Sequence, residues 1–127
     1  MIDALFSQPD YVAAKKMLDA TVLRHEAIAS NLANLETPNY QRIDVAPSFR
    51  NELREAISNG DVEKINDLQP RLEVDANAVA ASRDGNTVQL ETELANLQQN
   101  FLQHSVETHF VTQELLRLRS AILGQPQ

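Results

Sequence analysis

The chain has 127 residues, a formal net charge of -7, 5% aromatic residues, and no cysteine or tryptophan. A chain of this length is expected to fold as one domain. The lack of cysteine excludes disulfides and thiolate zinc sites, and the acidic balance argues against a nucleic-acid partner. Few aromatic residues and only three glycines disfavour small-molecule enzymes and nucleotide-binding folds, which depend on aromatic pocket walls and glycine-rich loops.

The first residues do not have the composition of a secretory signal. Asp3 stands where such a signal has Lys or Arg, and no long apolar run follows. Crossing a bilayer needs about 20 apolar residues. We therefore expect neither a cleaved signal peptide nor direct membrane insertion.

Residues 11–35 carry the first helical pattern. Pro9 and Asp10 favour a helix start, and Pro38 ends the helix because the residue before a proline is pushed out of the helical region. Spacings that alternate between three and four predict a heptad seam, a stripe along one side of the helix. Its members are Tyr11, Ala14, Leu18, Thr21, His25, Ile28, Leu32 and Leu35.

The middle segment is less regular. Phe49, Leu53 and Ile57 at spacings of four predict one short helix that ends near Asn59 and Gly60. Beyond Gly60 the apolar residues are too few and too irregular to define an element, so a loop or partial disorder is expected.

A second seam runs through the C-terminal part of the chain. Asn86 is expected to cap a long helix, with Gln89 three residues later, and Gly124 and Pro126 are expected to end it. The seam consists of Leu90, Leu94, Leu97, Phe101, His104, Thr108, Val111, Leu115, Leu118 and Ile122. A further apolar stripe beside it consists of Leu102, Val106 and Phe110.

Two such helices predict an all-α fold. Each narrow apolar stripe needs a partner, so the long N- and C-terminal helices should pair as an antiparallel coiled-coil hairpin. Thr21 and His25 would then lie level with His104 and Thr108. The chain divides into an N-terminal helix with its end turn (1–40), a short, partly irregular middle segment (41–85) and a long C-terminal helix (86–127). The extra stripe requires cover from the middle segment or from other subunits.

The sequence contains no convincing set of catalytic or metal-binding residues. His104, Glu107 and His109 are the best metal or catalytic candidates, but His104 lies on the seam and His109 off it. A zinc site needs three or four converging ligands. We expect no enzyme activity, no catalytic or metal-binding residues, and no cofactor.

The end of the first helix carries a distinctive motif. Asn31, Ala33, Asn34, Thr37, Pro38, Tyr40 and Arg42 match the pattern S/N-N-x-A-N-x-x-T-P-G-Y-K/R. Asn39 replaces the usual Gly and is the next residue able to hold a left-handed turn conformation. Residues 85–94 resemble G-N-x-V-x-x-E-x-E-M/L-A, and residues 116–122 resemble a closing L-R-x-A-I. The chain thus resembles the flagellar basal-body rod and hook family, and its short length points to the smallest, proximal rod components.

The resemblance implies a structural subunit of the bacterial flagellar drive shaft. Family members leave the cytoplasm uncleaved through the flagellar type III export apparatus and polymerise helically into the rod that spans the periplasm. The implied partners are the chain itself, other rod proteins, basal-body ring and adaptor proteins, and the export apparatus. Export substrates carry a Phe-x-x-x-apolar signal, which Phe49 and Leu53 match. On spacing alone, the reading of these two residues as an apolar pair that anchors a short helix is favoured over an export signal, because such pairs are ordinary.

Two alternatives remain open. The chain could be another small rod protein of the same family. It could also be a helical binding module or export adaptor that holds a partner's amphipathic helix in a groove. A sharply melting monomer or dimer at all concentrations would favour the adaptor, and concentration-dependent polymers would favour the rod.

Overall fold

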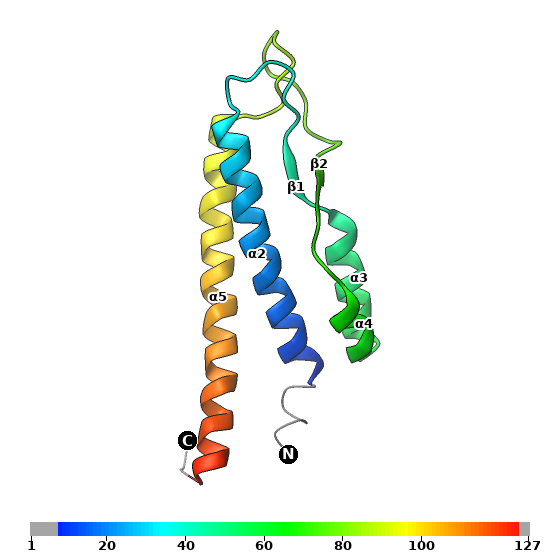
Figure 1. Ribbon diagram of the computed structural model, residues 1–127, viewed down its shortest axis with the longest axis vertical. Helices are drawn as coiled ribbons and strands as arrows, with labels where there is room; N and C mark the ends of the chain where they lie inside the picture. Colours follow the sequence, from blue (N-terminus) through cyan, green and yellow to red (C-terminus); the bar gives the residue numbers. More distant parts are fainter. Residues whose placement is uncertain (1–7, 125–127) are drawn as a thin grey trace.

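The computed structural model describes residues 8–124; the predictions for the first seven residues and for Pro126 lie outside this range. The described chain is mostly helical, as predicted, but it also has a small sheet. Its elements are α2 (Pro9–Ala33), β1 (Ile43–Val45), α3 (Pro47–Ser58), α4 (Val62–Asp67), β2 (Leu72–Val74) and α5 (Leu90–Leu123). The helices α2 and α5 lie side by side, and the other elements lie on the opposite side of α2 (Figure 1).

The middle segment is more regular than its sequence indicates. The predicted short helix is α3, which ends at Ser58, directly before Asn59. The expectation of a structureless stretch after Gly60 is wrong. A helix of six residues is capped there by the Asp61 carboxylate, which accepts a hydrogen bond from the backbone N of Lys64 at 3.1 Å. β2 then pairs antiparallel with β1. Elements this short show no measurable periodicity.

The hydrophobic core lies between α2 and the middle segment. Phe49 and Leu53 of α3 and Ile65 of α4 are buried there, against Val12 and Ala20 of α2. Among the described residues, α5 contributes no member to this buried cluster. The core therefore holds α2, α3 and α4 together and leaves α5 on the outer side of α2.

The loop before α5 differs from the prediction. The long helix begins at Leu90, after Gln89, and not at Asn86. Asn86 is 2% exposed, and its side-chain amide donates to the backbone carbonyls of Asn34, Leu35 and Thr37 at 2.8, 3.1 and 2.8 Å. It is thus used to satisfy carbonyls beyond the end of α2, which have no partner within the helix. Gly124, in the left-handed region with φ 66°, ends α5 as predicted.

The turn after α2 has the predicted form. Tyr40 N donates to the carbonyl of Thr37 at 3.3 Å, with Pro38 and Asn39 at the two central positions. Asn39 has a φ of 62°, which is the left-handed conformation that a turn of this type requires at its third residue. Its backbone N also donates to the carbonyl of Asp84 at 2.8 Å, so the turn is tied to the loop before α5.

We expect Asn39→Val to lower the free energy of unfolding by about 1–2 kcal/mol, because a β-branched side chain is strained in the left-handed region. Asn39→Gly, which restores the usual residue, should change it little. Asn59→Val is the matched control, since Asn59 is also exposed but has a φ of -87°. Thermal unfolding followed by circular dichroism measures all three; equal effects of the two Val variants would contradict the role of the turn.

Candidate assembly surface

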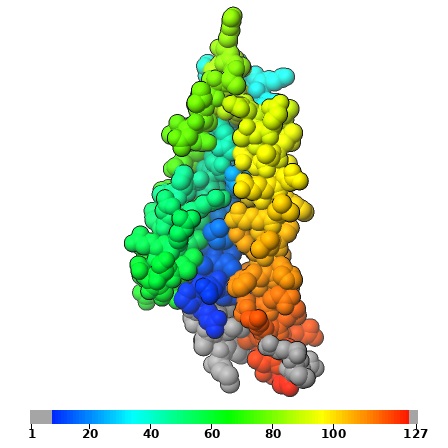
Figure 2. All heavy atoms as spheres, turned by 180° about the vertical axis from the view of Figure 1, so that it is seen from behind, coloured from blue at the N-terminus to red at the C-terminus, as the bar shows by residue number. Residues whose placement is uncertain are grey.

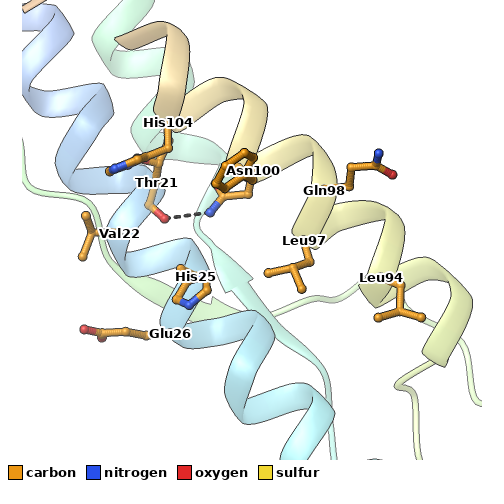
Figure 3. A pocket seen from close by; sticks show the side chains of 10 residues that line it. Thr21, Val22, His25, Glu26, Leu94, Leu97, Gln98, Asn100 and His104 are labelled. Atoms are coloured by element: carbon orange, nitrogen blue, oxygen red, sulfur yellow. Dashed lines mark hydrogen bonds between the residues drawn. The ribbon is translucent and has the colours of Figure 1, made fainter. Parts of the chain in front are cut away.

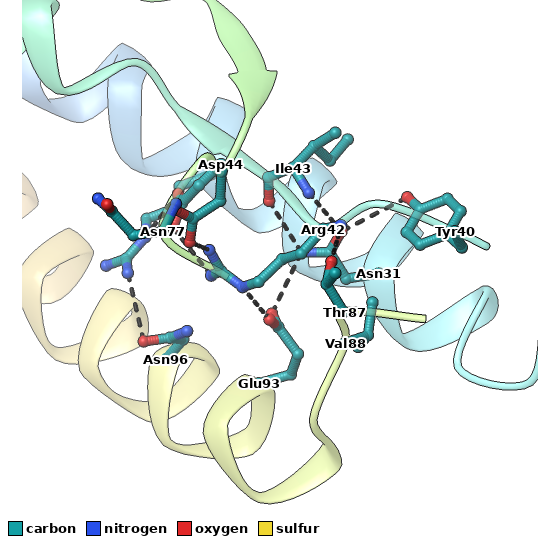
Figure 4. A network of polar contacts seen from close by, with 12 residues as sticks. Asn31, Tyr40, Arg42, Ile43, Asp44, Asn77, Thr87, Val88, Glu93 and Asn96 are labelled. Atoms are coloured by element: carbon teal, nitrogen blue, oxygen red, sulfur yellow. Dashed lines mark hydrogen bonds and ion pairs between the residues drawn. The ribbon is translucent and has the colours of Figure 1, made fainter. Parts of the chain in front are cut away.

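A buried polar cluster joins the motif at the end of α2, residues 31–42, to the start of α5 (Figure 4). The Arg42 guanidinium is at its centre and is 8% exposed. It donates from Nε to Glu93 of α5, from Nη1 to Asp75 at 2.7 Å and from Nη2 to Asp44 at 2.9 Å. Glu93 is completely buried. We call this cluster, together with Asn31, the Arg42 clasp.

Asn31 is the second anchor of the clasp. Its side chain pairs with the backbone of Ile43 in both directions, donating to the carbonyl at 2.9 Å and accepting from the N at 3.0 Å. The same amide group reaches Glu93 Oε2 at 3.3 Å. The Tyr40 hydroxyl lies 3.4 Å from Asn31 Oδ1 and 3.0 Å from Ser30 Oγ. Two motif residues, Asn31 and Arg42, therefore converge on one carboxylate of α5, and Tyr40 contacts Asn31.

The electrostatics of the clasp favour the charged forms. Burial alone would raise the pKa of Asp44, but the hydrogen bond from Arg42 and the nearby charge of Arg24 hold that pKa below its ordinary value. Burial alone would lower the pKa of Arg42, and its bonds to Glu93 and Asp44 instead raise it. A buried charge is tolerated only when it is paired and hydrogen-bonded, as these groups are.

The remaining motif residues lie in or beside the turn. Asn34 donates to the carbonyl of Ser30 at 2.8 Å and accepts from the Thr37 hydroxyl at 3.1 Å. Ala33, Thr37 and Pro38 are exposed. The motif thus has an inner part that binds α5 and an outer part on the surface.

Several residues of the clasp were not singled out in the sequence. In the sequence, Glu93 is distinguished only by the resemblance of residues 85–94 to the family pattern, because its partner Arg42 lies 51 residues away. Asp44 follows Arg42 by two positions, a spacing that places both on one face of a strand, and this was the available signal. Thr87 accepts from Arg42 N at 2.8 Å without any sequence signal. Asp75 lies in the stretch beyond Gly60, for which a loop or partial disorder is expected from the sequence.

The contact between α2 and α5 includes several polar pairs. Arg24 lies 3.4 Å from Asn96, and Asn100 donates to the backbone carbonyl of Thr21 at 2.8 Å. Thr21 Oγ1 lies 3.0 Å from His104 Nδ1, so this part of the predicted polar layer is present. His25 is exposed.

The predicted seams meet this contact only in part. On α2, Ile28 is buried, and Leu18 and Leu32 are half-buried. On α5, the half-buried members are Leu97, His104, Val111 and Leu118. The remaining large apolar members are exposed, so the prediction that they pack against α2 is wrong for the single chain; they are Leu90, Leu94, Phe101, Leu115 and Ile122. The stripe of Leu102, Val106 and Phe110 is exposed as well.

The exposed seam borders a groove between the two helices. The groove has a volume of about 790 Å³, and its walls are mainly apolar. Leu94 and Leu97 of α5 face Val22 and His25 of α2 across it (Figure 3). Figure 2 shows that α5 is open along one side of the molecule, and its C-terminal turns lie beyond the level of α3 and α4. The wall of this groove on α5 includes three members of the predicted seam, Leu94, Leu97 and Phe101.

Replacement of Glu107 by Leu is expected to stabilise the chain at neutral pH. Burial raises the pKa of Glu107, although Gln103 donates a hydrogen bond to Oε1 at 3.0 Å, and Oε2 is buried without a partner. Since its folded pKa lies above the unfolded one, the wild type should lose stability as pH rises through the folded value. We expect a gain of about 1 kcal/mol for Glu107→Leu near pH 7. Exposed Glu91 provides the control, Glu91→Leu, and urea unfolding the measurement; equal gains in both variants would refute the burial argument.

The other predicted residues give no chemical site. Among residues 8–124 no group of three potential ligands is placed to hold a metal ion, and no helix there is long and apolar enough to cross a membrane. Phe49 and Leu53 are 1% and 2% exposed and belong to the core. Their role as an export signal remains a prediction.

The exposed apolar stripe along α5 is the kind of surface that marks a protein which associates with other chains. No protein-family model matches the sequence. Three relatives share the name flagellar basal body rod protein FlgB. The one from Borrelia hermsii is 32% identical over 114 residues, which cover 76% of this chain and 82% of the relative. The one from Aquifex aeolicus is 30% identical over 118 residues, 89% of this chain and 92% of the relative. The one from Proteus mirabilis is 24% identical over 115 residues, 78% and 82%. The chain belongs to the FlgB family of flagellar basal body rod proteins, which are structural subunits located in the basal body and assembled with its other components.

Proposed function

We propose that this rod subunit polymerises by burying the outer face of α5 against a second copy of the chain. One observation carries the proposal: between Glu93 and Glu114 the only formally charged residue is Glu107, which is half-buried. The outer face there presents Leu94, Phe101 and other apolar side chains. Interface cores are depleted in charge, and a large exposed apolar patch marks a site of association.

The length of α5 favours a neighbouring subunit as the cover. Its 34 residues span about 51 Å, whereas the 25 residues of α2 span about 38 Å. Leu115, Leu116, Ile122 and Leu123 are all exposed in the last turns of α5. Each buried Leu or Ile contributes about 1.5–3 kcal/mol before ordering costs, so several such contacts are needed for a stable shaft.

We further infer that α2 and α5 act as an antiparallel coiled-coil hairpin within the rod. The contacts Asn31 to Glu93, Arg24 to Asn96 and Thr21 to Asn100 advance along α5 as they retreat along α2. The interpretation of 1–40 and 86–127 as the arms and of 41–85 as a variable middle segment accords with this order.

The route to the rod follows from the family. The chain would leave the cytoplasm through the flagellar type III apparatus without a cleaved signal, cross into the periplasm-spanning rod, and contact other rod proteins and ring or adaptor proteins. Because Phe49 and Leu53 are in the core, the export machinery would read them only in an unfolded chain. The exposed Ala33, Thr37 and Pro38 at the turn offer a further surface for assembly.

The decisive experiment locates the subunit. We expect an epitope-tagged chain to restore swimming in a strain lacking it and to be found by immunogold labelling in the rod of isolated basal bodies. The apparent molar mass of the purified protein, measured by light scattering, should rise with concentration. A sharply melting monomer at all concentrations, absent from basal bodies, would instead indicate an export adaptor.

A further inference from the structure

The inner side of α5 is polar at a regular interval. Glu93, Asn100, Glu107 and Glu114 follow each other at steps of seven residues, and they include the three buried residues of α5, which are Glu93, Asn100 and Glu114. Two of their atoms, Asn100 Oδ1 and Glu107 Oε2, are buried without a hydrogen-bond partner. Helix pairs normally bury apolar residues at such positions, and an unpartnered buried polar atom costs free energy.

A small roll of α5 about its axis would remove this conflict. Adjacent residues are 100° apart around a helix, so the seam centred on Glu93 and Leu97 lies about 50° from one centred on Leu94 and Leu97. After such a roll, Phe101 would replace Asn100 against α2. Leu97, which both seams share, would stay in place. Hydrophobic burial alone therefore favours the rolled position.

The contacts that oppose the roll are concentrated at the start of α5. Glu93 receives hydrogen bonds from Arg42 and Asn31 and is completely buried. Rolling the helix would withdraw this carboxylate and leave Arg42 with only Asp44 and Asp75. Further along, Asn100 donates one hydrogen bond to the carbonyl of Thr21, and His104 Nδ1 lies 3.0 Å from Thr21 Oγ1.

We propose that Glu93 is a positioning residue: its bonds to Arg42 and Asn31 fix the roll of α5 so that the apolar seam faces outward, toward a second copy of the chain. The inference rests on the proposed function for the identity of the neighbour. The roll itself is a property of the monomer and is tested without polymerisation.

The absence of cysteine allows single-thiol reporters. Phe101→Cys reports the outer side, where Phe101 is 68% exposed, and Gln103→Cys reports the half-buried inner side. Maleimide labelling of dilute monomer should modify position 101 faster than position 103. In the Glu93→Leu background we expect this order to reverse, with the rate at position 101 falling roughly tenfold as access is lost. Glu91→Leu, an exposed carboxylate in the same turn, should leave the order unchanged.

Circular dichroism establishes whether each variant is folded. If Glu93→Leu does not fold, Glu93→Gln retains the shape and the bond from Arg42 and should give a partial shift in the same direction. Unchanged labelling in folded variants would overturn the proposal, and so would loss of helix in both, since Glu93 would then serve stability alone. Light scattering of the same variants tests polymerisation separately: reversed labelling with unchanged polymers would sustain the roll and refute the proposed surface.

Discussion

Arg42→Met is expected to lower the free energy of unfolding by about 3–5 kcal/mol, the range found when one partner of a buried ion cluster is removed. The change would leave Glu93 buried without a cation and would remove the main partner of Asp44. Urea unfolding followed by circular dichroism measures the loss. A small domain is stabilised by only about 5–15 kcal/mol, so a large fraction of the total would be lost.

The control is Arg54→Met. Arg54 is exposed on α3, so its loss should cost less than about 0.5 kcal/mol. The pKa of Asp44 is held below its ordinary value, so this group stabilises the wild type above its unfolded pKa and loses that effect as pH falls. The gap between wild type and Arg42→Met should therefore narrow below about pH 4. Equal losses in the free energy of unfolding for the two arginine variants would show that the clasp contributes no more to stability than an exposed arginine does.

Local features of this fold could be predicted from the sequence. The turn from Thr37 to Tyr40 follows from a proline and an asparagine at two adjacent positions, and Asn39 does adopt a positive φ. The helix α3 follows from Phe49 and Leu53, four residues apart and both in the core. In each case the interactions that decide the structure lie within a few residues, so the pattern carries the information.

The rotational position of α5 could not be predicted in the same way. An apolar stripe shows that Leu94 and Phe101 require cover, but it does not show whether the cover lies in the same chain. Glu93 is buried because of Arg42 and Asn31, which are 51 and 62 residues away. Sequence patterns assign an apolar stripe to the nearest available helix, so the pattern predicts that this stripe packs against α2. A functional assembly surface is the kind of place where such local reasoning is expected to fail.

The second large effect concerns this surface. Phe101→Lys should abolish polymerisation and swimming while leaving the folded monomer intact. Phe101 is 68% exposed, so the change should alter the free energy of unfolding by less than about 0.5 kcal/mol. In a polymer the same position would be buried, and each contact would lose about 1.5–3 kcal/mol of apolar burial and gain an unpaired charge. Association should weaken by at least roughly tenfold per contact.

Val79→Lys supplies the matched control. Val79 is equally exposed, at 73%, but lies in the loop between β2 and α5, away from the apolar surface. Sedimentation velocity over a concentration series, together with swimming in a strain that lacks the native chain, distinguishes the two variants. Polymers and swimming retained by Phe101→Lys would show that the outer face of α5 is solvated in the rod. Loss in both variants would point to added charge in general. Loss confined to Phe101→Lys would assign the apolar seam of α5 to contacts between subunits. Burial in such contacts would then account for the lack of charge on the seam, for its outward position and for the length of α5 beyond α2.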